Sequence, residues 1–154
     1  MKKQILICGI AALLIGMVSC KSVQKEVKVS DTVSVDIEVS PVEKYWKLTE
    51  LFGEPVVTSE GGKEAHLILK KEDNRVTGSG GCNTFNGTYT LEAGNRIRFS
   101  HMISTMMMCA NMDVEMKLNK VFEMVDNYTI KDDVLVLNKA RMAPLARFEV
   151  VYMK

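Results

Sequence analysis

Four cysteines are the residues of this 154-residue chain whose type and spacing bear most directly on chemistry. Cys8 lies in an apolar segment near the start of the chain, and Cys20 ends that segment. Cys82 and Cys109 lie in the downstream part. If the chain is exported, an oxidising compartment favours a disulfide between this second pair. A reactive thiol and a pair of metal ligands are the alternative interpretations.

Cysteine catalysis would require one of these thiols to be a thiolate beside a histidine base. The two histidines are His66, expected in a strand, and His101, expected at the end of a strand. His101 could approach Cys109, but a cysteine in a disulfide cannot act as a nucleophile. The adjacent acids Asp132 and Asp133 fit a solvated turn better than an acid–base pair. We therefore expect no enzymatic activity and no cofactor.

Methionines gather around His101 and Cys109 in the sequence: Met102, Met106, Met107, Met108, Met112 and Met116. Thioether, imidazole and thiolate groups are ligands that suit cuprous copper. The candidate copper ligands are His101, Met102, Met106, Met108 and Met112. Their spacing is irregular, however, and no Met-x-x-Met repeat is present. We expect the methionines to fill irregular gaps between a sheet and the start of a helix, with copper binding as the alternative function.

The start of the chain predicts export. Two lysines precede a charge-free apolar run, Ile5–Val18, which is too short for a comfortable membrane-spanning helix. Ser19 and Cys20 close this run in a pattern that resembles a bacterial lipobox, in which Cys20 becomes the lipid-modified first residue. We predict a lipoprotein signal peptide over residues 1–19 and a lipid-anchored tether over residues 20–43.

The predicted tether also indicates where the protein resides. The residue after the lipid cysteine is Lys21 and not an aspartate, so by resemblance nothing retains the protein at an inner membrane. We therefore expect it at the outer membrane, which it would contact through its lipid. Alternating apolar residues between Val27 and Val39 leave open an added edge strand. Asp31-Thr32-Val33 resembles a short O-glycosylation site, although a chance match explains it more simply.

The charge balance excludes one class of partner. The chain has 20 basic and 19 acidic residues, and removal of the two signal lysines leaves 18 basic and 19 acidic. No arginine cluster or basic helix is present. Because binding to nucleic acid needs a basic patch that contacts phosphates, we expect no nucleic acid partner.

The remaining residues, 44–154, predict one folded domain. Short alternating segments predict strands over residues 45–51, 65–69, 88–91, 96–99, 128–130, 134–137 and 145–152, and residues 75–77 lead into a glycine-rich turn. Apolar residues from Val114 to Val125 recur with a helical period, and Asn111 is a plausible cap for that helix. We predict an α+β fold, in which an antiparallel sheet forms a compact roll or a barrel-like sheet with one inserted helix.

The glycine-rich segment between two of these strands carries a family resemblance. The motif residues are Gly78, Gly80, Gly81, Cys82 and Asn83, then Gly87 and Tyr89, then Thr105, Met107 and Cys109. In this order they resemble the META, or HslJ-like, domain over residues 44–154. Relatives often carry a basic residue where this chain has Met106, and proline where it has Asn111.

The resemblance implies a compact antiparallel β structure with a helix, often carried by envelope lipoproteins linked to heat shock and envelope stress, without an established enzymatic activity. Asn83 is expected to bond backbone groups of the turn, while Gly80 and Gly81 supply positive φ angles. The alternative leaves Asn83 exposed in a groove. We expect a binding or structural module whose partner is an envelope protein or an apolar ligand.

Overall fold

The computed structural model describes residues 40–58, 61–141 and 143–152 of the chain. The predicted signal peptide, the lipidation site Cys20, the Asp31-Thr32-Val33 tripeptide and the possible extra strand lie outside the described residues. Within the described residues, no helix is long and apolar enough to cross a membrane.

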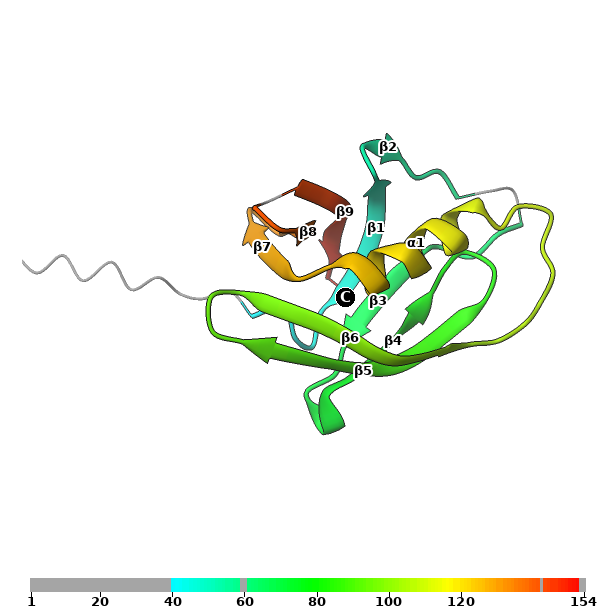
Figure 1. Ribbon diagram of the computed structural model, residues 1–154. Helices are drawn as coiled ribbons and strands as arrows, with labels where there is room; N and C mark the ends of the chain where they lie inside the picture. The colour runs from blue at the N-terminus through cyan, green and yellow to red at the C-terminus, as the bar shows by residue number, and fades with distance from the viewer. Residues whose placement is uncertain (1–39, 59–60, 142, 153–154) are drawn as a thin grey trace, which may run out of the picture. The chain divides into compact units, whose positions relative to one another are not determined.

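The described strands form a closed antiparallel barrel of eight, with a short ninth strand attached to its first (Figure 1). The barrel strands are β1 (Tyr45–Leu51), β3 (His66–Leu69), β4 (Arg75–Ser79), β5 (Thr84–Glu92), β6 (Arg96–Ser104), β7 (Asn127–Lys131), β8 (Val134–Lys139) and β9 (Ala143–Val151). β2 (Glu54–Pro55) forms a hairpin with β1, and a 3₁₀ turn, η1 (Glu72–Asn74), precedes β4.

Pairing between the first and last barrel strands closes the sheet. Trp46 pairs with Val150, and Leu48 pairs with Phe148. The barrel-like sheet with one helix is therefore confirmed, whereas the α+β roll is corrected to a mostly β closed barrel. The reason is that closure pairs every barrel strand on both sides and removes the free edges that an open roll would leave.

β5 and β6 are longer than the sequence pattern predicts. The predicted strands end at residues 88 and 99 on their motif side, but the ladder continues to Phe85 opposite Ser104. A bulge interrupts it beside Gly87, where an added Cβ would lie 2.4 Å from the sulfur of Met102. The sequence pattern stops short because glycine and polar residues interrupt the alternation, although the backbone pairing persists.

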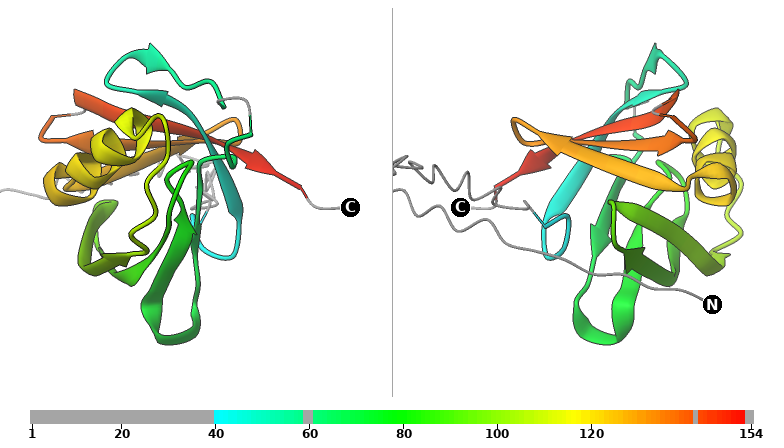
Figure 2. Two further views of the ribbon diagram at one scale, coloured as in Figure 1. Left: turned by 90° about the vertical axis from the view of Figure 1, so that its right-hand side faces the viewer. Right: turned by 60° about the vertical axis from the view of Figure 1, so that its left-hand side comes forward.

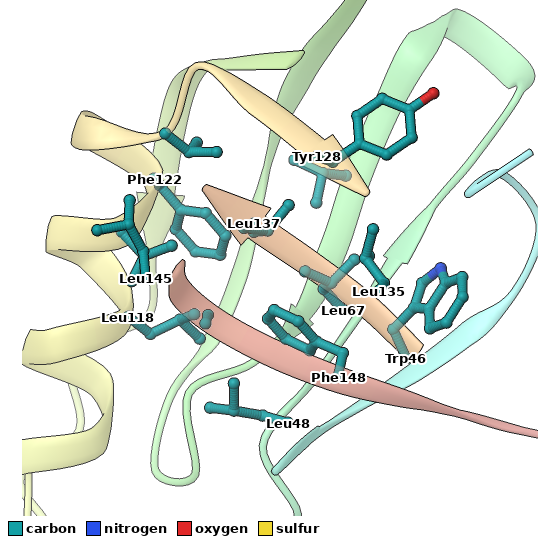
Figure 3. Packing of buried hydrophobic residues seen from close by; sticks show 14 of the residues in the cluster. Trp46, Leu48, Leu67, Leu118, Phe122, Tyr128, Leu135, Leu137, Leu145 and Phe148 are labelled. Carbon is teal, nitrogen blue, oxygen red and sulfur yellow. The ribbon is translucent and has the colours of Figure 1, made fainter. Parts of the chain in front are cut away.

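Side chains from both the strands and the helix fill the barrel (Figure 3). Trp46 and Phe148 are fully buried, as period-two alternation predicts for β1 and β9. The Trp46 indole donates a hydrogen bond of 2.8 Å to the carbonyl oxygen of Pro41. That contact ties the residues before β1 to the core.

The helix α1 (Asp113–Met124) lies across one end of the barrel (Figure 2). Its buried face includes Leu118, Val121 and Phe122, and the Phe122 ring centroid lies 5.0 Å from that of Phe85 on β5. The helix is thus confirmed, but its N-cap is Met112 and not Asn111. Asn111 lies one residue earlier, where its Oδ1 accepts the Asp113 N–H at 2.9 Å.

Candidate functional site

The glycine-rich turn connects β4 to β5 and lies against the first turn of α1. Gly81 has a φ of +102°, in the region that glycine adopts readily, as predicted. Gly80 does not have a positive φ, so its predicted role is wrong. A Cβ on Gly80 would lie 2.8 Å from Cγ of Glu115, so glycine is needed there for close approach of the helix. Gly80 donates its N–H to the Asn83 carbonyl at 2.9 Å.

A disulfide joins this turn to the loop that precedes α1. Cys82 and Cys109 are bonded with a Cα–Cα distance of 6.1 Å, within the 4.4–6.8 Å expected for such bonds, so the predicted pair is present. Cys82 is buried, whereas Cys109 is exposed. The bond fixes the segment we call the 105–112 loop, which runs from β6 to α1. While the bond is intact, neither sulfur is a thiolate.

Asn83 is the polar centre of the site, with 2% of its surface exposed. Its Oδ1 accepts hydrogen bonds from the Thr105 hydroxyl and the Met107 N–H, both at 2.7 Å. Its Nδ2 donates to the Met107 carbonyl and to Oε1 of Glu115, both at 3.0 Å. One buried side chain thus holds both backbone groups of Met107. The geometry supports the structural role predicted for Asn83 over an exposed position in a groove.

Glu115 is the partner that sequence analysis did not assign to Asn83. Its side chain is buried, and its Oε2 accepts the backbone N–H of Asn83 at 2.9 Å, while Oε1 accepts the Nδ2 of the same residue. A signal was present, because Glu115 lies three residues before Leu118 on the apolar face of the helix. A carboxylate on such a face needs hydrogen-bond donors.

Among the described residues, no buried side-chain nitrogen or oxygen lacks a hydrogen-bond partner. The site therefore offers no unpaired buried polar group to a small ligand. Its polar atoms are used to hold the loop, the turn and the helix together.

The other motif residues divide between this site and the barrel. Thr105 belongs to the site, since its N–H donates to the Thr84 carbonyl at 3.0 Å beside Asn83. Gly78 belongs to the barrel, where an added Cβ would lie 2.1 Å from the carbonyl oxygen of His66. Tyr89 also belongs to the barrel and donates its hydroxyl to the Lys70 carbonyl at 3.0 Å.

A groove of about 290 Å³ lies beside the disulfide. One side comes from the residues that follow β2, including Val56 and Val57. The other side comes from the loop and the start of the helix: Met107, Cys109, Ala110, Asn111 and Val114. Figure 1 shows these two segments on the same side of the barrel. The glycine turn contributes Gly80, Gly81 and Cys82. The disulfide and Asn83 therefore fix one wall of this groove.

The groove is mainly apolar, and Lys63 is the one charged residue among its described lining residues. An ion pair between Lys117 of α1 and Glu54 of β2 links the two elements from which its walls extend. The hydrogen bond in this pair raises the pKa of Lys117 and lowers the pKa of Glu54. Both groups are exposed, so we assign the pair little stabilising energy.

The methionines do not fill gaps as predicted. Met106 and Met108 are 97% and 101% exposed. Met102 packs against the core, and Met112 is half-buried. The 105–112 loop is held by Asn83 and the disulfide rather than by methionine packing, which explains why these side chains point outward.

Among the described residues, the side-chain hydrogen bond of His101 is to a hydroxyl group and not to another of the predicted copper ligands. Its Nδ1 lies 3.4 Å from the Thr88 hydroxyl, at a bulge in β6 where His101 has a φ of 52°. Cys109 is committed to the disulfide. The part of the chain that the structure describes contains no group of three or more His, Cys, Asp or Glu residues arranged to hold a metal.

Replacing Gly80 with alanine should lower the free energy of unfolding by about 1–3 kcal/mol, because the new methyl group would collide with Glu115 and force the helix away. Thermal or chemical denaturation measures the change. Gly94→Ala is the matched control. It carries only backbone strain at a φ of +76°, with open space around the new Cβ, and should cost about 1 kcal/mol. A Gly80 variant less affected than this control would contradict the assigned close approach.

The family model for the META domain matches residues 38–152. Similar solved structures include an NMR structure of a protein from Burkholderia xenovorans, at 18% identity and a TM-score of 0.60, which covers 73% of this chain and 85% of that chain. Another is an NMR structure at 21% identity and a TM-score of 0.58, which covers 73% of this chain and 95% of that one.

A crystal structure of a DUF4847 family protein from Bacteroides vulgatus is also similar, at 13% identity and a TM-score of 0.52, covering 76% of this chain and 98% of that chain. At these identities the three structures support the fold alone. No curated protein matches the chain.

Proposed function

Because this chain belongs to the META domain family, with the family model covering residues 38–152, we propose that it is a non-enzymatic envelope lipoprotein that binds other envelope proteins. The groove beside the disulfide is the observation that carries this proposal. The partner is an extended, acidic segment of another protein. One apolar side chain of that segment enters the groove and anchors it. Its place in envelope stress tolerance rests on the family resemblance.

The size and lining of the groove favour a protein segment over a small molecule. Its volume of about 290 Å³ lies at or below the lower end of ligand pockets, which span roughly 300–1,000 Å³. Such a space fits an anchoring side chain rather than an enclosed ligand. Val57 is 78% exposed at its rim, so apolar surface is available to a partner without any rearrangement of the core.

The charge of the groove selects the partner chemistry. Lys63 is exposed and has its backbone fixed by a hydrogen bond of 3.0 Å from its N–H to the Gly81 carbonyl. An acidic residue next to the anchoring side chain would meet this ammonium group. Complementary charge at an interface gives selectivity more than raw affinity, so the expected signature is discrimination between acidic and basic segments.

Two synthetic peptides test this proposal, each with a central leucine, one flanked by aspartates and the other by lysines. NMR titration of the protein should show shifts at Gly81, Ala110 and Val114, with the acidic peptide binding about tenfold more tightly, a difference of roughly 1.4 kcal/mol. Lys63→Glu should remove or invert this preference. Lys120→Glu, the same charge change on the exposed face of α1, should leave it unchanged. Equal binding of both peptides, or shifts away from the groove, would contradict the proposal.

The lipid anchor is proposed from the sequence and has its own test. Cys20→Ala should prevent lipid attachment and change the fate of the precursor, because the cysteine that receives the acyl chains would be absent. Mass spectrometry of the mature native chain should find a lipid-modified cysteine at its N-terminus. A mature chain that is unmodified, or cleaved at another position, would refute the anchor and the outer-membrane assignment with it.

A further inference from the structure

The methionines of the 105–112 loop have a pattern of exposure that the proposed binding groove does not use. Met107 is 53% exposed and lines the groove, whereas its two neighbours, Met106 and Met108, are 97% and 101% exposed. Asn83 explains this difference in exposure. Its side chain binds the backbone N–H and carbonyl of Met107, and the side chains on either side of Met107 therefore point outward.

We propose that Met106 and Met108 form a site of reversible oxidation, which takes peroxide-class oxidants and is repaired by a methionine sulfoxide reductase. Fully exposed thioethers are open both to a small oxidant and to a reducing enzyme. Two such residues flank a backbone segment that is fixed in place, so a reductase would meet them in a constant geometry.

The chemistry needs no cofactor on this protein. A sulfur lone pair attacks one oxygen of hydrogen peroxide, the O–O bond breaks, and the products are the sulfoxide and water. The sulfur loses two electrons and the peroxide gains them. In the repair step, two thiols of the reductase supply two electrons and two protons, which regenerates the thioether and yields water and a disulfide on the reductase.

The fold tolerates this modification at the two positions. Neither Met106 nor Met108 belongs to the core, so a polar sulfoxide there displaces no packed atom. Met102 and Met124 differ, since both are partly buried and pack against the core. Oxidation of a packed methionine places a polar group among apolar neighbours and destabilises the fold. The protein thus has exposed thioethers that can be oxidised without loss of structure and packed ones that cannot.

The test exposes the full chain to limiting hydrogen peroxide and follows sulfoxide at each methionine by peptide mass spectrometry. Met106 and Met108 should be oxidised at least about fivefold faster than Met102 and Met124, with the unfolding midpoint unchanged once both are modified. Added methionine sulfoxide reductases of both stereospecific classes should return both residues to methionine.

A pair of variants makes the test specific. Met106→Leu with Met108→Leu should slow peroxide consumption and leave the unfolding midpoint within error of the parent protein. The exposed Met107 and Met116 should account for much of the consumption that remains. Met102→Leu is the matched control and should consume peroxide at the rate of the parent protein, because Met102 packs against the core. Equal oxidation rates at exposed and packed methionines, a lowered midpoint after oxidation of Met106 and Met108, or failure of the reductases to restore them would each overturn the proposal.

Discussion

Replacing Asn83 with alanine is expected to lower the free energy of unfolding by about 3–4 kcal/mol. The substitution removes five side-chain hydrogen bonds at a position that is 2% exposed, one of them a weak contact of 3.7 Å with the Cys82 sulfur. It leaves the Met107 backbone and one oxygen of the buried Glu115 carboxylate without their partner. Unpaired buried groups cost about 1–3 kcal/mol each, and water entering from the exposed loop would offset part of that sum. Chemical denaturation of the two proteins measures the difference.

The matched control for this prediction is Asn119→Ala on the exposed face of α1. It removes the same amide from a site with no buried partners and should change stability by no more than about 0.5 kcal/mol. An unchanged midpoint for the Asn83 variant would refute its structural role and leave it as a candidate binding residue.

Removing the disulfide is expected to cost about 3–4 kcal/mol, because the bond closes a loop between residues separated by 27 positions and so restricts the unfolded chain. We would replace Cys82 and Cys109 together by alanine, since a serine hydroxyl at the buried position 82 would need a new partner. The barrel should still form, with its far-ultraviolet circular dichroism retained, because the strands pair independently of the bond.

Chemical reduction provides the control for this double variant. A thiol reductant should shift the unfolding midpoint of the parent protein to that of the alanine variant and should leave the variant unaffected. If the parent and the variant unfold at the same denaturant concentration without reductant, or if the native protein titrates with two free thiols, the disulfide does not hold the loop.

Local patterns in the sequence were sufficient to predict most elements of the fold. Alternation at Trp46 and Leu48 placed one face of β1 in the core, and the helical period from Val114 located α1 to within one residue at either end. Closure of the barrel could not be predicted in this way, because pairing between β1 and β9 joins the two ends of the domain. Nothing in the local pattern of either strand specifies its distant neighbour.

The candidate site was predictable in its covalent link and not in its polar network. The predicted export and the count of cysteines pointed to Cys82 and Cys109 as the pair, and the structure joins them. Asn83 and Glu115 are 32 residues apart in the sequence, and only folding of the chain brings them into contact. The outward position of Met106 and Met108 was missed for the same reason, since an apolar residue type alone predicts burial.

Amide hydrogen exchange along the 105–112 loop shows whether Asn83 anchors this loop and so forms one wall of the groove. The N–H of Met107 donates to Asn83 Oδ1 at 2.7 Å although it lies outside any helix or strand. By NMR at neutral pH, it should exchange at least about 100-fold more slowly than its intrinsic rate, because this partly buried hydrogen bond opens only when the loop separates from Asn83. The amides of Met106 and Met108 should exchange rapidly. Equally fast exchange at all three residues would contradict the anchoring of the loop by Asn83.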